Sequence, residues 1–127
     1  MLRGFPATEP AWALRAYLVL IGCAYHGETI TYGQLAAAIN RGSPNLLAQP
    51  LDCLTRWCTH NGQPQIASLV VESGTGMPAP DFTAVTRDQI PSEHEKIWAH
   101  DWFSFLPPTI MELAENANED RGFSKRI

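Results

Sequence analysis

The chain has few basic residues. It carries nine Lys and Arg side chains against thirteen Asp and Glu, which gives a formal net charge of -4 over 127 residues. Residues 28–79 contain two cations, Arg41 and Arg56, against three carboxylates. A protein that contacts about six DNA phosphates needs several Lys or Arg side chains, because neutralised phosphates supply most of the sequence-independent affinity. The shortage disfavours an ordinary surface for free DNA.

Long apolar runs are also missing. The longest stretch, residues 17–25, is interrupted by Gly22 and falls well short of the ~18 apolar residues that a membrane-spanning helix needs. Glu9 and Arg15 interrupt the pattern of a secretion signal near the beginning of the sequence. We therefore expect a cytoplasmic protein with no membrane partner.

Cysteine is scarce, and three cysteines cannot form a closed set of disulfides. Cys23, Cys53 and Cys58 lie among apolar neighbours, so we expect reduced thiols in the core. Cys53 and Cys58 are five residues apart and point to different faces of a helix, and His60 is in register with only one of them. Metal ligands need tighter spacing. We expect no metal ion and no cofactor.

What is present indicates one globular domain over residues 1–127: hydrophobic residues make up 45% of the chain, and four of them are tryptophan. A first helix is predicted from Thr8, a capping residue, to Gly27, a common helix stop. A second begins at Thr31, which forms a capping box with Gln34. Gly33 is unexpected there, since glycine in a helix costs ~1 kcal/mol relative to alanine; the close approach of another backbone segment or of a phosphate would account for it.

The remaining pattern predicts a turn at 43–48, a helix at 49–59, a strand at 66–72 and a glycine- and proline-rich loop at 73–80. A partner strand is expected within 76–84. This order is typical of a winged helix. The predicted fold class is therefore α+β and mostly helical, a winged helix-turn-helix-like domain over residues 8–85 with a β-hairpin wing.

A helical extension is predicted over residues 86–117. Its first helix begins near Pro91 and continues into an aromatic run, with Trp98 and Trp102 four residues apart on one face. Thr109 and Glu112 form a second capping box before a last helix at 110–117. Residues 118–127 are expected to be a flexible tail.

Two segments, GETITYGQLAAAIN (27–40) and IASLVVESGTGMPAPDF (66–82), resemble the DNA-binding domain of the O6-alkylguanine-DNA alkyltransferase and alkyltransferase-like proteins. The similarity covers residues 11–82. It implies that Tyr32 matches the tyrosine that helps to rotate the target nucleotide out of the stack and that Gly33 matches the glycine behind it. Ala67 falls where the alkyl-accepting cysteine would be. Ser68 and Leu69 fall where the family has His and Arg.

These departures change what the resemblance implies. Alkyl transfer needs a nucleophilic sulfur, and Ala67 provides none. The arginine that fills the space of the flipped base should lie within 44–52, where the chain reads PNLLAQPLD. A serine-based catalytic site is a further possibility, with Ser68 or Ser73, His60 and Asp52. The sequence lacks the G-x-S-x-G turn on which a hydrolase places its serine. We therefore expect no catalytic residues.

Two functional hypotheses remain. The first is a non-enzymatic, small acidic binding module that docks on a protein or nucleoprotein partner, of the regulator, immunity-factor or inhibitor type. Aromatic side chains dominate interface hot spots, and the acidic surroundings suit a basic partner. The candidate partner-binding residues are Trp98, Trp102, Phe103 and Phe105.

The second hypothesis is an alkyltransferase-like DNA-binding protein without alkyl-transfer activity. The candidate DNA contacts are Tyr32, Gly33, Arg41, Arg56, Gly74 and Gly76. Neither hypothesis indicates a small-molecule ligand.

Overall fold

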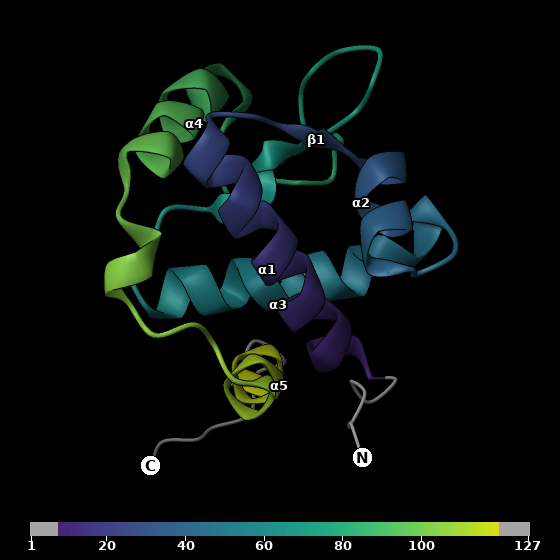
Figure 1. The fold of residues 1–127 in the computed structure, drawn as a ribbon, viewed down its shortest axis with the longest axis vertical. Coiled ribbons are helices and arrows are strands. Elements are labelled where there is room, and N and C mark those ends of the chain that lie inside the picture. Colours follow the sequence, from purple (N-terminus) through teal and green to yellow (C-terminus); the bar gives the residue numbers. More distant parts are fainter. Residues whose placement is uncertain (1–7, 120–127) are drawn as a thin grey trace.

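The computed structural model describes residues 8–119, which form a mostly helical fold with one small sheet (Figure 1). The described helices are α1 (Glu9–His26), α2 (Tyr32–Ile39), α3 (Ala48–His60), α4 (Ile90–Ala99) and α5 (Ile110–Glu119). Short 3-10 turns occupy residues 44–47, 66–69, 87–89 and 102–104. The sheet pairs β1 (Ile30–Thr31) with β2 (Val70–Val71) in parallel. The predicted α+β, mostly helical class is confirmed.

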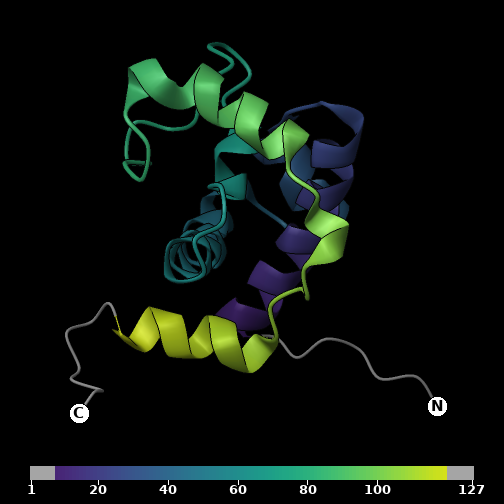
Figure 2. The same ribbon diagram turned by 90° about the vertical axis from the view of Figure 1, so that its left-hand side faces the viewer.

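Helix α1 is the centre of the packing, and α3 crosses it (Figure 1). Helix α5 packs against both α1 and α3, whereas α4 lies toward the opposite end of the molecule (Figure 2). The predicted limits of α1 are confirmed: the Thr8 hydroxyl accepts a hydrogen bond from the Ala11 amide, and Gly27 is left-handed at φ 69°. Within residues 8–119, no helix combines the length and the apolar character needed to cross a membrane.

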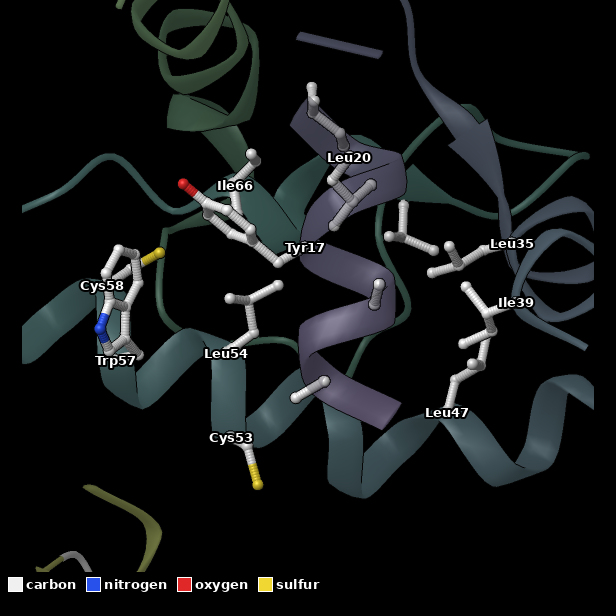
Figure 3. Close-up of a cluster of buried hydrophobic side chains, with 14 of the residues drawn as sticks. Tyr17, Leu20, Leu35, Ile39, Leu47, Cys53, Leu54, Trp57, Cys58 and Ile66 are labelled. Carbon is white, nitrogen blue, oxygen red and sulfur yellow. The ribbon is translucent and has the colours of Figure 1, made fainter. Parts of the chain in front are cut away.

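The core lies between α1 and α3 (Figure 3). Tyr17 of α1 meets Trp57 of α3 edge to face, with ring centroids 5.7 Å apart. Leu54 and Cys58 on the same side of α3 are fully buried. Leu20 continues the α1 stripe toward Leu35, which anchors α2. Burial of these apolar side chains is the main stabilising term of the fold.

Helix α2 is followed by the 3-10 turn at residues 44–47 and then by α3. Thr31 and Gln34 form the expected capping box, with reciprocal bonds of 3.0 and 3.1 Å. Asn40 ends α2 in the left-handed conformation at φ 62°. The capping box of Thr109 and Glu112 at the start of α5 is likewise confirmed.

The prediction of a strand over residues 66–72 is wrong in most of its length. Residues 66–69 form a 3-10 turn, and only Val70–Val71 is extended. These two residues pair with Ile30–Thr31, some forty positions earlier in the chain, and the expected antiparallel partner in 76–84 is absent from the described residues. Pro78 and Pro80 lack backbone N–H donors, and the Ala79 N–H between them is bonded to Tyr32. The predicted hairpin wing therefore finds no support.

The predicted aromatic helix also differs, because α4 ends at Ala99. His100 is extended, and the chain turns so that the Trp102 indole N–H donates to the Ile97 carbonyl at 2.9 Å. Trp98 and Trp102 therefore do not share one helical face. Of the predicted tail, residues 118 and 119 belong to α5, and residues 120–127 lie outside the described residues.

Candidate binding surfaces

An open groove of about 790 Å³ lies along the outer side of α3. The exposed side of α3 forms one wall, from Ala48 to His60, and the segment 79–84 lies opposite. Tyr32 and Ala67 also line it. The sheet brings these two together, since Tyr32 directly follows β1 and Ala67 lies shortly before the parallel β2. The two positions that the alkyltransferase resemblance aligns with functional residues thus share one groove.

Tyr32 holds the segment 79–84 in place. Its hydroxyl accepts a hydrogen bond of 3.0 Å from the Ala79 amide. Arg87 ties down the same segment by donating to the carbonyls of Pro78, at 2.6 Å, and Ala79, at 3.4 Å. Burial raises the pKa of the Tyr32 hydroxyl, and the nearby carboxylates of Asp81 and Glu72 raise it further. Tyr32 therefore stays a neutral, structural side chain at physiological pH.

The groove carries more negative than positive charge. Three carboxylates line it, from Asp52, Glu72 and Asp81, against the single guanidinium of Arg56. Arg56 forms an ion pair of 2.8 Å with Asp52, one helical turn earlier. The other two carboxylates then leave a local excess of negative charge. Such a field repels phosphate and attracts cations.

The candidate DNA contacts are not brought to one surface. Tyr32 and Arg56 line the groove, but Arg41, Gly33, Gly74 and Gly76 do not. Arg41 donates to the Glu9 carboxylate at 3.1 Å and lies 4.7 Å from the ring of Trp12. Its guanidinium thus connects the start of α1 to the turn after α2.

Two glycines among the candidate DNA contacts, Gly76 and Gly33, differ in backbone conformation. Gly76 is left-handed, at φ 70°, in the tight turn in which its N–H donates to the Glu72 carbonyl. Gly33 is exposed and has a negative φ, and a Cβ built on it would meet nothing within 4 Å. No close backbone approach therefore accounts for it.

Exposed apolar side chains gather where the end of α1 meets residues 102–106. We call this the aromatic surface, defined by Tyr25, Phe103, Phe105 and Leu106, which are 72%, 71%, 45% and 89% exposed. The rings of Tyr25 and Phe103 lie 6.0 Å apart, edge to face. Phe105 stacks on His100 at 5.0 Å, and a small pocket between α1 and α4 includes His100, Tyr25 and Phe103.

The two tryptophans of the predicted partner-binding set line the same small pocket but are less exposed than Phe103 and Phe105. Trp102 is 5% exposed and meets Tyr17 edge to face in the core, at 6.4 Å. Trp98 is half-buried, and its indole N–H donates to the Glu28 carbonyl at 3.3 Å. Trp102 is therefore a core residue rather than part of a contact surface, whereas Phe103 and Phe105 are accessible.

The residues considered for catalysis are not assembled. Asp52 and His60 line the groove, but Ser68 is fully buried and does not. The His94 ring bonds to the Ser68 backbone carbonyl at 2.8 Å, not to its hydroxyl. Cys58 is also fully buried, and burial raises its pKa to about 12, so its thiol remains protonated. Across residues 8–119, His, Cys, Asp and Glu side chains form no cluster of three that could hold a metal ion.

Sequence reasoning missed several residues of these surfaces. Tyr25 has the helical spacing of the buried residues of α1, but its side chain is exposed. Phe82 and Asp81 lie in a loop whose position depends on the hydrogen bond between Tyr32 and Ala79. These two residues are 47 positions apart in the sequence, so no local pattern reveals the bond. Leu106 is the residue whose exposure had a local signal in the sequence. It is apolar and precedes two prolines, which disfavour a helix at that point.

In comparisons with known proteins, the chain matches no protein-family model, no curated protein and no solved structure.

Proposed function

We propose that this protein is a non-enzymatic binding module that docks on a protein or nucleoprotein partner through the aromatic surface. The observation that carries the proposal is the exposed Phe103 ring, 71%, edge to face with the exposed ring of Tyr25, with Leu106, 89% exposed, in the same segment of the chain. Contiguous exposed apolar side chains on a soluble chain mark interaction sites. Aromatic anchors of this kind supply most of the binding energy at protein interfaces.

Charge suggests which partner fits. Glu28 and Asp101 are exposed beside the aromatic surface, and Asp101 lines its small pocket. The partner that suits this surface is a protein segment with apolar side chains flanked by Lys or Arg. Complementary rim charges steer such an encounter and select against acidic partners.

The arginines and lysine of the described residues favour a protein over free DNA. Each has a bonding partner within the chain. Arg41 pairs with Glu9, Arg56 with Asp52 and Lys96 with Glu93. Arg15 donates to the Ile39 carbonyl, and Arg87 to that of Pro78. Binding phosphates would compete with these contacts. The free thiols of Cys23, Cys53 and Cys58 suit a reducing compartment, which supports a cytoplasmic location.

The second candidate is an alkyltransferase-like DNA-binding protein built on a winged-helix scaffold. One observation favours it: Tyr32 and Ala67 line the same groove beside α3, the second helix of the helix-turn-helix order. A mobility-shift titration with duplex DNA at low salt tests it. Salt-sensitive binding that Tyr32→Ala and Arg56→Ala both weaken would support this candidate, and no shift at micromolar protein would eliminate it.

The first proposal is tested by quantitative affinity capture from lysate with matched surface variants. Phe103→Asp with Leu106→Asp places charge on the aromatic surface, and Leu46→Asp places it on another exposed leucine, in the turn before α3. We expect captured proteins to be lost from the double variant and kept by the Leu46 variant. Equal capture by all three chains contradicts the proposal, as does a wild-type dimer in light scattering that the double variant alone abolishes.

A further inference from the structure

We propose that the groove along α3 is a second binding site, which takes an extended segment of a partner protein and holds an arginine or lysine side chain of that segment beside Tyr32, Phe82, Glu72 and Asp81. This site is separate from the aromatic surface: the two have no lining residue in common.

The shape of the groove suits an extended chain. It follows α3 from Ala48 to His60, and at 1.5 Å rise per residue this wall is about 18 Å long. That length accommodates roughly five extended residues at about 3.3 Å each. The groove is open to solvent, so an extended segment can enter it.

Charge selects a cationic guest. The Asp52 carboxylate is paired with Arg56, whereas the carboxylates of Glu72 and Asp81 form no ion pair within residues 8–119. Both also raise the pKa of Tyr32, which places their charge near its ring. Arg87 is the other cation near this ring; it is bonded to neutral backbone carbonyls, so its charge offsets one of the two carboxylates and an excess of negative charge remains. A guest arginine or lysine would neutralise the excess charge, whereas a phosphate would add to it.

Aromatic side chains complete the site. Tyr32 and Phe82 both line the groove, and both are half-buried, so part of each ring is accessible to a guest. A guanidinium or ammonium over such a ring gains cation–π attraction, which increases as the site is desolvated. Ala67 also lines the groove, and its side chain is only a methyl group.

The site is formed before any guest arrives. The Tyr32 hydroxyl fixes Ala79, and Arg87 fixes Pro78, so the segment carrying Asp81 and Phe82 is tied at its start. Preorganisation of this kind lowers the entropy cost of binding. The exposed amides of Asn45 and Gln49 lie at the other end of the groove and can bond to the backbone of an extended guest.

The test is a titration of the full ¹⁵N-labelled chain, followed by amide chemical shifts. The probes are acetylated, amidated pentapeptides of alanine and glycine with a central arginine, lysine, citrulline or glutamate. Citrulline keeps the shape of arginine and removes its charge. We expect the arginine and lysine peptides to shift the amides of Ala67, Ala79 and Asp81. The citrulline and glutamate peptides should leave them in place.

Charge variants provide the matched comparison. Glu72→Gln and Asp81→Asn should each lower the affinity of the arginine peptide for the groove about two- to fivefold, as expected for exposed ion pairs. Asp88→Asn makes the same change at an exposed aspartate outside the groove and should leave affinity unchanged. Phe82→Ala should also weaken binding of the arginine peptide, because the ring supplies cation–π attraction. Amide dispersion in each variant's free spectrum verifies folding.

Several outcomes overturn the inference. Equal shifts with the arginine and citrulline peptides would show that charge does not select the guest. A 12-base-pair DNA duplex that moves these amides at low salt, when the peptides do not, would assign the groove to nucleic acid. If deletion of residues 120–127 alone moves them, the guest is the chain's own C-terminal segment. The two proposals can fail separately. If the peptides respond as expected but the variant with Phe103→Asp and Leu106→Asp still captures its partners, the groove is a binding site and the aromatic surface is not.

Discussion

The carboxylate of Glu93 accepts a hydrogen bond of 2.7 Å from the backbone amide of Gln65, 28 residues earlier. Glu93 is only 8% exposed, and its other oxygen lies 3.3 Å from the Lys96 ammonium. The bond joins α4 to the start of the 66–69 turn, directly before Ala67 in the groove. Helix α4 therefore holds the start of the segment that carries Ala67, one of the residues lining the groove.

Removing this carboxylate should destabilise the protein. Glu93→Ala leaves the Gln65 N–H without its acceptor, which costs about 1–3 kcal/mol for a buried donor. Urea unfolding followed by tryptophan fluorescence measures the loss. Glu95→Ala, on the exposed side of the same helix, should stay within about 0.5 kcal/mol of wild type. Equal effects of the two substitutions would show that the Glu93–Gln65 bond contributes nothing specific.

Truncation of two adjacent aromatic residues should change the stability of the protein by very different amounts. Trp102→Ala removes a buried indole that packs on Tyr17 and bonds to Ile97, so we expect a loss of about 3–5 kcal/mol. Phe103→Ala removes an exposed ring and should change stability by less than about 0.5 kcal/mol. Denaturant midpoints of the two variants give the comparison. A larger loss with Phe103→Ala would contradict the described burial.

The sequence predicted the parts of this fold that are determined by neighbouring residues. Helix limits are fixed by bonds within one or two turns. Thr8 caps the start of α1 and Gly27 its end, and capping boxes start α2, at Thr31 and Gln34, and α5, at Thr109 and Glu112. Such signals need no knowledge of the rest of the chain. The helix-turn-helix order followed from them because α2 and α3 are adjacent along the chain.

What could not be predicted depends on contacts between distant residues. Val70 pairs with Ile30, and Tyr32 holds Ala79; neither pairing has a local signature. Helical spacing carried the prediction for α4 past Ala99, but the packing of Trp102 on Tyr17 turns the chain inward there. The groove has no local signature for the same reason: its two walls come from α3 and from a loop that the Tyr32 hydroxyl and the Arg87 guanidinium hold in place.

Gly33 offers a test of stability against binding. Alanine fits there without a clash, since φ is negative and nothing lies within 4 Å of the added Cβ. Gly33→Ala should therefore stabilise the protein, by up to about 1 kcal/mol, through the reduced entropy of the unfolded chain. Thermal unfolding measures the gain. If the variant is more stable and binds its ligands at the aromatic surface and the groove as the wild type does, Gly33 has no role in binding. A destabilised variant would contradict the open space around Gly33.

Stability should fall steeply in alkaline solution because of two buried groups. Burial raises the pKa of Cys58 from 9.0 to about 12 and that of Tyr17 from 10.0 to about 12. Between pH 9 and 12 the unfolded chain has released protons that the folded chain still holds. Each titrating group then favours unfolding by up to about 1.4 kcal/mol per pH unit. The stabilisation is complete below pH 9 and is lost as the pH rises toward 12.

Urea unfolding at pH 8, 9.5 and 10.5 (about one unit apart, to separate the two titrations) tests this dependence. Cys58→Ala should reduce the slope from about pH 9 upward, and Tyr17→Phe should reduce it only above about pH 10, since these are the ordinary pKa values of the two groups. At pH 8 and below, each variant should differ from wild type by a constant amount, which isolates the change in packing from the titration. A wild-type slope retained by the double variant would assign the alkaline sensitivity to other groups, because only a group that titrates differently in the two states makes stability depend on pH.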